Sequence, residues 1–120
     1  MDPEQKHLKY LEKVLKNLKS ADPFTKADAV RQLGELKNKI PLNLQKKVVL
    51  EVFELSREKD QRVRLQATIA IGMLKDITPK EMQSDVVNRL LELSSDSEWG
   101  VRSHSVIAIG RLGYSTSRTE

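Results

Sequence analysis

Apolar residues recur along this chain with the spacing of amphipathic helices, and the predicted helices come in pairs. Between residues 41 and 57 the apolar positions, centred on Val48, Val49 and Val52, lie along one side of a helix. A short polar break follows, and a second helical pattern covers 61–76. The apolar face of this second helix, which is predicted to pack on the first, consists of Val63, Ala67, Ala70, Ile71 and Leu74.

Prolines and glycines return every 38 positions and divide the chain into three repeats. They are Pro3, Pro41 and Pro79, together with Gly34, Gly72 and Gly110. Proline suits the first turn of a helix because it lacks the N–H that is unpaired there. Asp22 and Asp60 are suited to cap the second helices. The repeats are 3–40, 41–78 and 79–116, with helices predicted near 4–19, 23–38, 41–57, 61–76, 79–95 and 99–113.

The repeat pattern predicts one all-α domain. We expect an α-α superhelix, a solenoid of three 38-residue helix pairs with six helices, over residues 1–116. We also expect a flexible tail at 117–120, with disorder beginning at Tyr114. Because a glycine inside a helix costs about 1 kcal/mol relative to alanine, its return in each second helix predicts close approach by a neighbouring helix. The predicted core residues are Leu74, Ile71, Ala67, Leu112 and Ile109.

Two segments resemble the second helix of a HEAT repeat. They are DQRVRLQATIAIGML, at 60–74, and SEWGVRSHSVIAIGRL, at 97–112. The family pattern has an acidic residue, then Val-Arg, then small residues, then an aliphatic-Gly-x-Leu ending. The first repeat departs from it, with Thr25-Lys26 in place of Val-Arg. The resemblance implies a HEAT/armadillo-like solenoid whose second helices line a concave face. It does not by itself indicate a function, because this architecture hosts many roles. The protein-binding scaffold that we expect follows from the surface of the second helices, described below.

Acidic and basic residues four positions apart mark the start of each second helix. The pairs are Asp22/Lys26, Asp60/Arg64 and Glu98/Arg102. In HEAT-like repeats such residues form ladders that tie one repeat to the next, and the resemblance implies the same here. The alternative is a row of cations that binds phosphate groups.

The side of the second helices that faces away from the first helices is mixed rather than polar. A surface that meets only water should be polar, so its apolar centre predicts a groove for a peptide or protein segment. The alternative is that Ile69 and Ile107 pack between neighbouring second helices. Trp99 either anchors the partner or seals a joint between repeats. The candidate partner-binding residues are Arg62, Leu65, Ile69, Met73, Trp99, Ile107 and Arg111.

Composition and motifs narrow the function classes. The absence of cysteine excludes disulfides, thiolate metal sites and cysteine nucleophiles. Neither His7 nor His104 has a second ligand at metal spacing, and no catalytic motif or phosphate loop is visible. We therefore expect no enzyme, no catalytic or metal-binding residue and no cofactor. With no secretory signal at the N-terminus and no segment apolar enough to span a membrane, we expect a cytoplasmic protein that does not bind membranes.

The two ends of the chain differ. Lysines line one side of the first predicted helix, and a leucine row lies opposite: Lys6, Lys9, Lys13 and Lys16 against Leu8, Leu11, Leu15 and Leu18. We interpret the lysines as a solvated cap. The alternative is a basic module that contacts nucleic acid, which a net charge of +4 permits. At the other end Val87, Leu91, Val106 and Gly110 are predicted to stay uncovered, so we expect an interface there, either for self-association or for further repeats.

Overall fold

The chain forms six α-helices and no strand in a computed structural model that describes residues 1–113. The α-helices are α1 (Pro3–Asn17), α2 (Pro23–Leu36), α3 (Leu42–Leu55), α4 (Gln61–Met73), α5 (Gln83–Leu93) and α6 (Trp99–Leu112). Three short 3-10 helices join them: η1 (Lys37–Lys39), η2 (Lys75–Ile77) and η3 (Lys80–Met82). The prediction of six helices is confirmed within 1–113. The predicted tail, at 117–120 with disorder from Tyr114, lies outside the described residues.

Aspartates cap the helices where the sequence indicated. The Asp22 carboxylate accepts a hydrogen bond from the backbone N–H of Thr25 at 3.1 Å, and the Asp60 carboxylate accepts one from Arg62 at 2.8 Å. Asp2 does the same for α1, in a reciprocal pair with Gln5. These bonds satisfy N–H groups that have no partner inside the helix, and therefore fix the points at which the helices begin.

The helix bounds next to Pro41 and Pro79 differ from those that the periodicity suggested. Helices were predicted to reach residues 38 and 76, but α2 and α4 end at Leu36 and Met73 and continue as 3-10 turns. The residue before a proline is restricted to extended backbone. Ile40 and Thr78 accordingly have ψ angles of 127° and 120°. The prediction that a helix starts at residue 79 is likewise wrong, because η3 comes first and α5 starts at Gln83.

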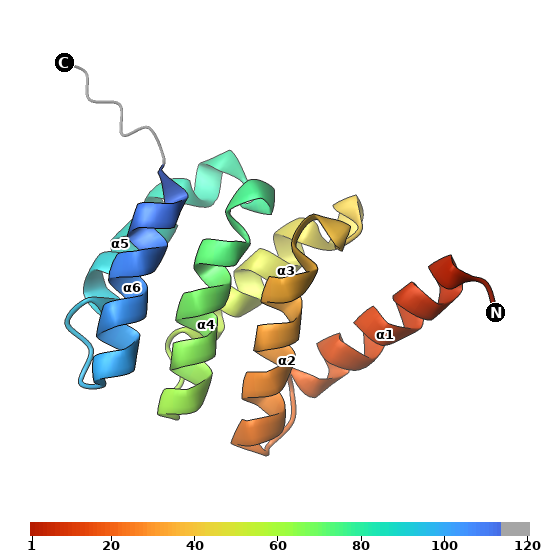
Figure 1. Cartoon of the computed structure of the whole chain (residues 1–120), viewed down its shortest axis with the longest axis horizontal. Coiled ribbons are helices and arrows are strands. Elements are labelled where there is room, and N and C mark those ends of the chain that lie inside the picture. The colour runs from red at the N-terminus through yellow and green to blue at the C-terminus, as the bar shows by residue number, and fades with distance from the viewer. Residues whose placement is uncertain (114–120) are drawn as a thin grey trace.

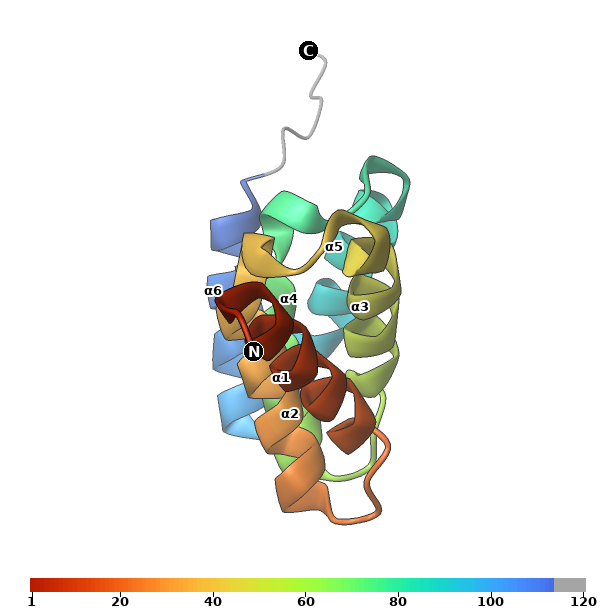
Figure 2. The same cartoon turned by 90° about the vertical axis from the view of Figure 1, so that its right-hand side faces the viewer.

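The helices form two layers. Figure 1 shows α2, α4 and α6 side by side, and Figure 2 shows α3 and α5 in a second layer behind them. Each of the pairs α1/α2, α3/α4 and α5/α6 is in contact, while the most extensive packing joins α2 to α4 and α4 to α6. The arrangement is compatible with three stacked helix pairs.

The core lies between the two layers and consists of aliphatic side chains. Four of the five predicted core residues, Leu74, Ile71, Ala67 and Leu112, are 0–4% exposed, so their burial is confirmed. The prediction for Ile109 is only partly right, since this side chain packs against the core but stays half-buried. Within the leucine row of α1, Leu11 and Leu18 are buried but Leu8 is 44% exposed. Figure 1 shows the reason: the N-terminal end of α1 lies away from α2, and only its C-terminal end is close to that helix.

Glycine sets how closely the second helices approach. A Cβ atom added to Gly34 would lie 3.2 Å from the Cα of Ala70, and one added to Gly72 would lie 3.1 Å from the Cβ of Ala108. Both distances are shorter than ordinary carbon contacts. Close approach is therefore confirmed at these two glycines. At Gly110 no described atom lies within 4 Å of the added Cβ.

Ion pairs connect successive helix pairs, but with partners other than the predicted ones. Lys26 bonds to Glu58 at 3.3 Å and Arg64 bonds to Asp96 at 2.9 Å. Lys26 and Arg64 therefore do connect successive helix pairs, as predicted. Asp60, the expected acidic partner of Arg64, caps α4 instead. Partial burial would raise the pKa of Asp96, but its hydrogen bonds to Arg64 and to the Glu98 backbone outweigh burial and hold the pKa below its ordinary value.

Candidate functional site

The second helices α2, α4 and α6 together present a surface with three shallow recesses, which we call the second-helix face. The recess between the first halves of α2 and α4 has a volume of about 310 Å³, and the next, further along the same two helices, about 290 Å³. Arg31 and Gln66 line both recesses. A third, of about 40 Å³, lies between α4 and α6 and shares Ile69 with the second. The recesses therefore adjoin one another across all three helices.

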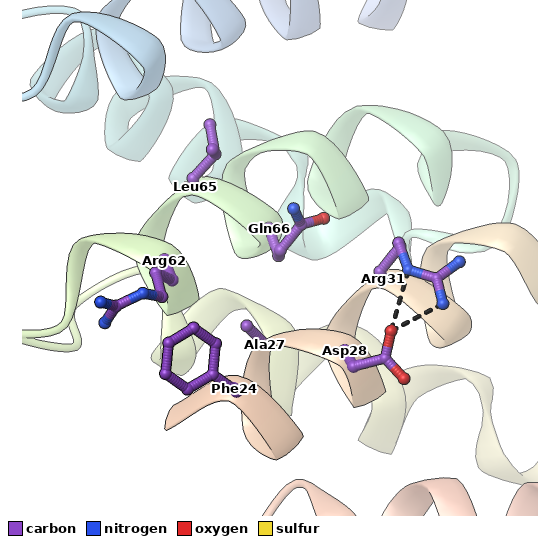
Figure 3. A pocket seen from close by; sticks show the side chains of 7 residues that line it. All are labelled: Phe24, Ala27, Asp28, Arg31, Arg62, Leu65 and Gln66. Carbon is purple, nitrogen blue, oxygen red and sulfur yellow. Dashed lines mark hydrogen bonds and ion pairs between the residues drawn. The ribbon is translucent and has the colours of Figure 1, made fainter. Parts of the chain in front are cut away.

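An exposed aromatic ring defines the first recess. Phe24 is 62% exposed, and the guanidinium carbon of Arg62 lies 4.3 Å from the centre of its ring. Figure 3 shows the two side chains next to each other, Phe24 from α2 and Arg62 from α4. Arg62 also pairs with Asp60 at 2.9 Å. The interaction of a cation with the face of an aromatic ring is worth about 0.5–1 kcal/mol at an exposed site. This contact therefore helps to hold the Phe24 ring at the rim of the recess.

Arg31 is held on the surface of its own helix, between the first two recesses. It bonds to Asp28 at 2.6 Å and to Glu35 at 2.9 Å (Figure 3 draws the Asp28 bonds). The hydrogen bonds that Arg31 donates to Asp28 and then to Glu35, followed by the charges of both carboxylates, raise the pKa of Arg31 above its ordinary value. All three side chains are about half exposed. The pairing fixes the charge pattern of this part of the face without removing it from water.

Apolar side chains continue the face into the second and third recesses. Met73 and Ile69 are half-buried, whereas Ile107 is 50% exposed. Ile69 therefore packs partly between second helices, as the alternative interpretation held, while Ile107 keeps half of its surface open. The ring of His104 lies in the third recess, where its Nδ1 donates to the Gly100 carbonyl at 3.0 Å.

Trp99 does not join the other predicted residues. Six of the seven candidates line the recesses, namely Arg62, Leu65, Ile69, Met73, Ile107 and Arg111. Trp99 is the first residue of α6, is 73% exposed and lines none of these three. A side chain this exposed does not seal a joint between helix pairs, which leaves its role as a partner anchor a prediction.

None of the predicted site residues lies on α2, although this helix lines two of the recesses. The missed residues are Phe24, Arg31 and Glu35, which line the first two recesses. A signal for them was present, because they precede Arg62, Ile69 and Met73 by one 38-residue repeat. Their types differ from those in repeat 2, so the apolar pattern did not reveal them.

A fourth recess lies away from this face. It also has a volume of about 310 Å³ and is lined by Leu18, Lys19, Leu50, Glu51, Glu54 and Leu55, from the end of α1 and from α3. Leu50 is 42% exposed. This recess shares no lining residue with the other three, so we regard the second-helix face as the better candidate for an extended ligand.

Within residues 1–113 no group of three or more histidine, aspartate or glutamate side chains is placed to hold a metal ion. None of the helices in this range combines the length and the apolar character needed to cross a membrane. A scan of the chain against protein-family models gives no match, and a search of curated proteins gives none either.

Proposed function

We propose that this chain is a protein-interaction scaffold, built as a HEAT-like solenoid of three helix pairs, and that its second-helix face binds a partner segment. In such a solenoid this face is the concave one. The observation that carries the proposal is the run of exposed and half-exposed apolar side chains along adjoining recesses: Phe24, Leu65, Ile69, Met73 and Ile107. Apolar side chains gathered on one face are typical of interaction surfaces.

The chemistry of the face favours a segment with apolar anchors. Shallow recesses across three helices suit side chains inserted at intervals, as an extended strand or an amphipathic helix presents them. Affinity would come from burial of Leu65, Ile69 and Ile107, at about 25 cal/mol per Å² of apolar surface. Arg62 and Arg111 are exposed and would add orientation and association rate rather than most of the affinity.

Two exposed aliphatic residues offer a matched test. Ile107 is 50% exposed and lines the third recess, whereas Leu42, the first residue of α3, is 84% exposed and lines none of the recesses described above. Proteins captured from native cell extract by the wild-type chain should be lost from an Ile107→Glu bait and retained by a Leu42→Glu bait. Circular dichroism checks that both variants stay folded. The proposal is wrong if the Ile107→Glu bait captures the same proteins as the wild type.

Salt dependence separates this proposal from the nucleic-acid alternative. The lysines of α1, Lys6, Lys9, Lys13 and Lys16, are all exposed, which is what a phosphate contact would need. Binding to duplex DNA through several phosphates weakens by orders of magnitude as salt rises from about 50 to 200 mM. Binding through the apolar face should change far less. A steep salt slope, abolished by replacing two of the lysines with glutamine, would favour the nucleic-acid module.

A further inference from the structure

Three of the polar or close contacts across the boundary between the α3/α4 and α5/α6 pairs involve residues that the repeat pattern carries on to the end of the α5/α6 pair. Arg89 donates hydrogen bonds to the Ser56 carbonyl and hydroxyl at 2.7 and 3.0 Å, and Arg64 forms an ion pair with Asp96 at 2.9 Å. In addition, Ala108 packs closely against Gly72. One side of the boundary thus contributes a serine, an arginine and a glycine. The other side contributes an arginine, a carboxylate and an alanine.

The C-terminal edge of the α5/α6 pair carries the first of these two sets again. Ser94, Arg102 and Gly110 follow Ser56, Arg64 and Gly72 by 38 residues each. We call Ser94, Arg102 and Gly110 the C-terminal edge triad. Within residues 1–113 none of the three meets the kind of group that its counterpart meets. Gly110 has no described atom within 4 Å of an added Cβ, and no described carboxylate lies within ion-pair distance of Arg102.

The triad has the same local geometry as its bound counterpart. The Nη1 of Arg64 donates to the Glu58 carbonyl at 3.0 Å, and the Nη1 of Arg102 donates to the Asp96 carbonyl at 2.7 Å. The hydroxyl of Ser94 donates to the carbonyl three residues before it, as the hydroxyl of Ser56 does. Arg102 is therefore held in the orientation in which Arg64 meets a carboxylate.

Exposed aliphatic side chains lie on the same pair of helices. Val106 on α6 is 61% exposed and Leu91 on α5 is 53% exposed. Val106 precedes Gly110 by four residues, so both lie on one side of α6. The edge therefore combines apolar surface with an arginine that lacks a described carboxylate partner.

We propose that this edge is a docking site for a helix pair that lies outside residues 1–120. That helix pair presents an alanine to Gly110, a carboxylate to Arg102 and a long cation to Ser94. The two boundaries inside the chain support the choice of occupant. Gly34 and Lys26 meet an alanine and a carboxylate in the same register, as Gly72 and Arg64 do.

A second copy of this chain does not match the edge. Its exposed N-terminal end carries Lys13, Ser20 and Gln32 where the α5/α6 pair carries Arg89, Asp96 and Ala108. Head-to-tail docking would keep the cation but lose the carboxylate and replace alanine with a longer side chain against Gly110. Two C-terminal edges placed together would present the same triad twice and supply none of its partners.

The test joins a copy of residues 79–116 directly after Thr116, which continues the 38-residue register. The copy supplies its own Arg89, Asp96 and Ala108 to the edge triad. Two variants change the copy only: Asp96→Asn, which keeps the hydrogen-bonding shape but removes the charge, and Ala108→Leu, which crowds Gly110. Asp85→Asn in the copy is the control. Asp85 is exposed on α5, and its substitution removes one negative charge, as Asp96→Asn does.

We expect amide protection throughout the appended pair and at Val106. We also expect Asp96→Asn to lower Tm by roughly 2–4 °C, Ala108→Leu to lower it further and Asp85→Asn to leave it nearly unchanged. Equal Tm values in all arms, or an appended pair without amide protection, overturn the proposal. So does a 120-residue chain that dimerises in sedimentation runs at rising concentration and becomes monomeric on Val106→Glu substitution, because a second copy would then be the occupant.

Discussion

The glycines of the second helices allow one substitution to be compared at a closed and an open position. Gly72→Ala and Gly110→Ala make the same change at equivalent positions of α4 and α6. At Gly72 the new methyl group would lie 3.1 Å from the Cβ of Ala108 and 3.2 Å from its Cα. At Gly110 it would meet no described atom within 4 Å. The gain in helix propensity from glycine to alanine should be similar at the two positions. The two substitutions differ in whether the new methyl group meets a neighbouring helix.

The expected free energies follow from two opposing effects. Alanine stabilises a helix interior by about 1 kcal/mol relative to glycine. Relief of the crowding at Gly72 needs a shift of the Ala108 backbone by a few tenths of an ångström, and overpacking of this kind costs about 1–3 kcal/mol. Gly72→Ala should therefore lower the free energy of unfolding by about 0–2 kcal/mol. Gly110→Ala should raise it by up to about 1 kcal/mol, less any loss from its place near the helix end.

Urea unfolding followed by far-ultraviolet circular dichroism measures both values, provided that the slope with urea is unchanged. A rescue variant isolates the contact: Gly72→Ala combined with Ala108→Gly exchanges the two residues across the interface. The double variant should lose less stability than the sum of the single variants, with a coupling energy of about 0.5 kcal/mol or more. If Gly72→Ala stabilises the chain as much as Gly110→Ala does, the reasoning about helix approach is refuted.

Three further predictions concern the core, the caps and the ion pairs. Leu74→Ala should cost about 2–5 kcal/mol in urea unfolding, since Leu74 is 1% exposed and the change leaves a cavity; a loss near zero would mean that the site collapses. Asp60→Ala should cost about 1 kcal/mol by removing the α4 cap, whereas Asp60→Asn should cost little. The pKa of Asp96 is held below 3.8, so its stabilising contribution is complete above that pH and is lost as pH falls through the folded-state pKa. The urea midpoint should thus fall less steeply below about pH 4 in Asp96→Asn than in the wild type; equal slopes would contradict the pairing with Arg64.

Local chemistry made the helices predictable from the sequence. The spacing of apolar residues identified the α4 face that buries Ala67, Ile71 and Leu74, because a helix places residues three and four apart on one side. Aspartate before a helical pattern located the start of α2 and of α4, because capping uses N–H groups within three residues. The recurrence of glycine indicated close approach, since a residue unfavourable for the helix needs a compensating contact.

The candidate site was only partly predictable. Six of the seven candidate residues line the recesses because they share one side of their helices, which periodicity shows. Phe24 and Arg62 lie too far apart in sequence for their contact to be inferred without the packing of α2 on α4. The exposure of Trp99 depends on which surfaces α6 meets, and its sequence neighbours do not specify that.

The sequence by itself determined where the helices lie, which side of each is apolar and which positions return in register. Only the tertiary structure decided which residues of one helix pair meet those of the next. It assigned Asp96 rather than Asp60 to Arg64 and placed Ala108 against Gly72, while Gly110 met no described neighbour. The physical reason is one of distance. Helix formation and capping depend on residues within four positions along the chain. The contacts between helix pairs described here join residues 32 to 38 positions apart and exist only once the layers have packed.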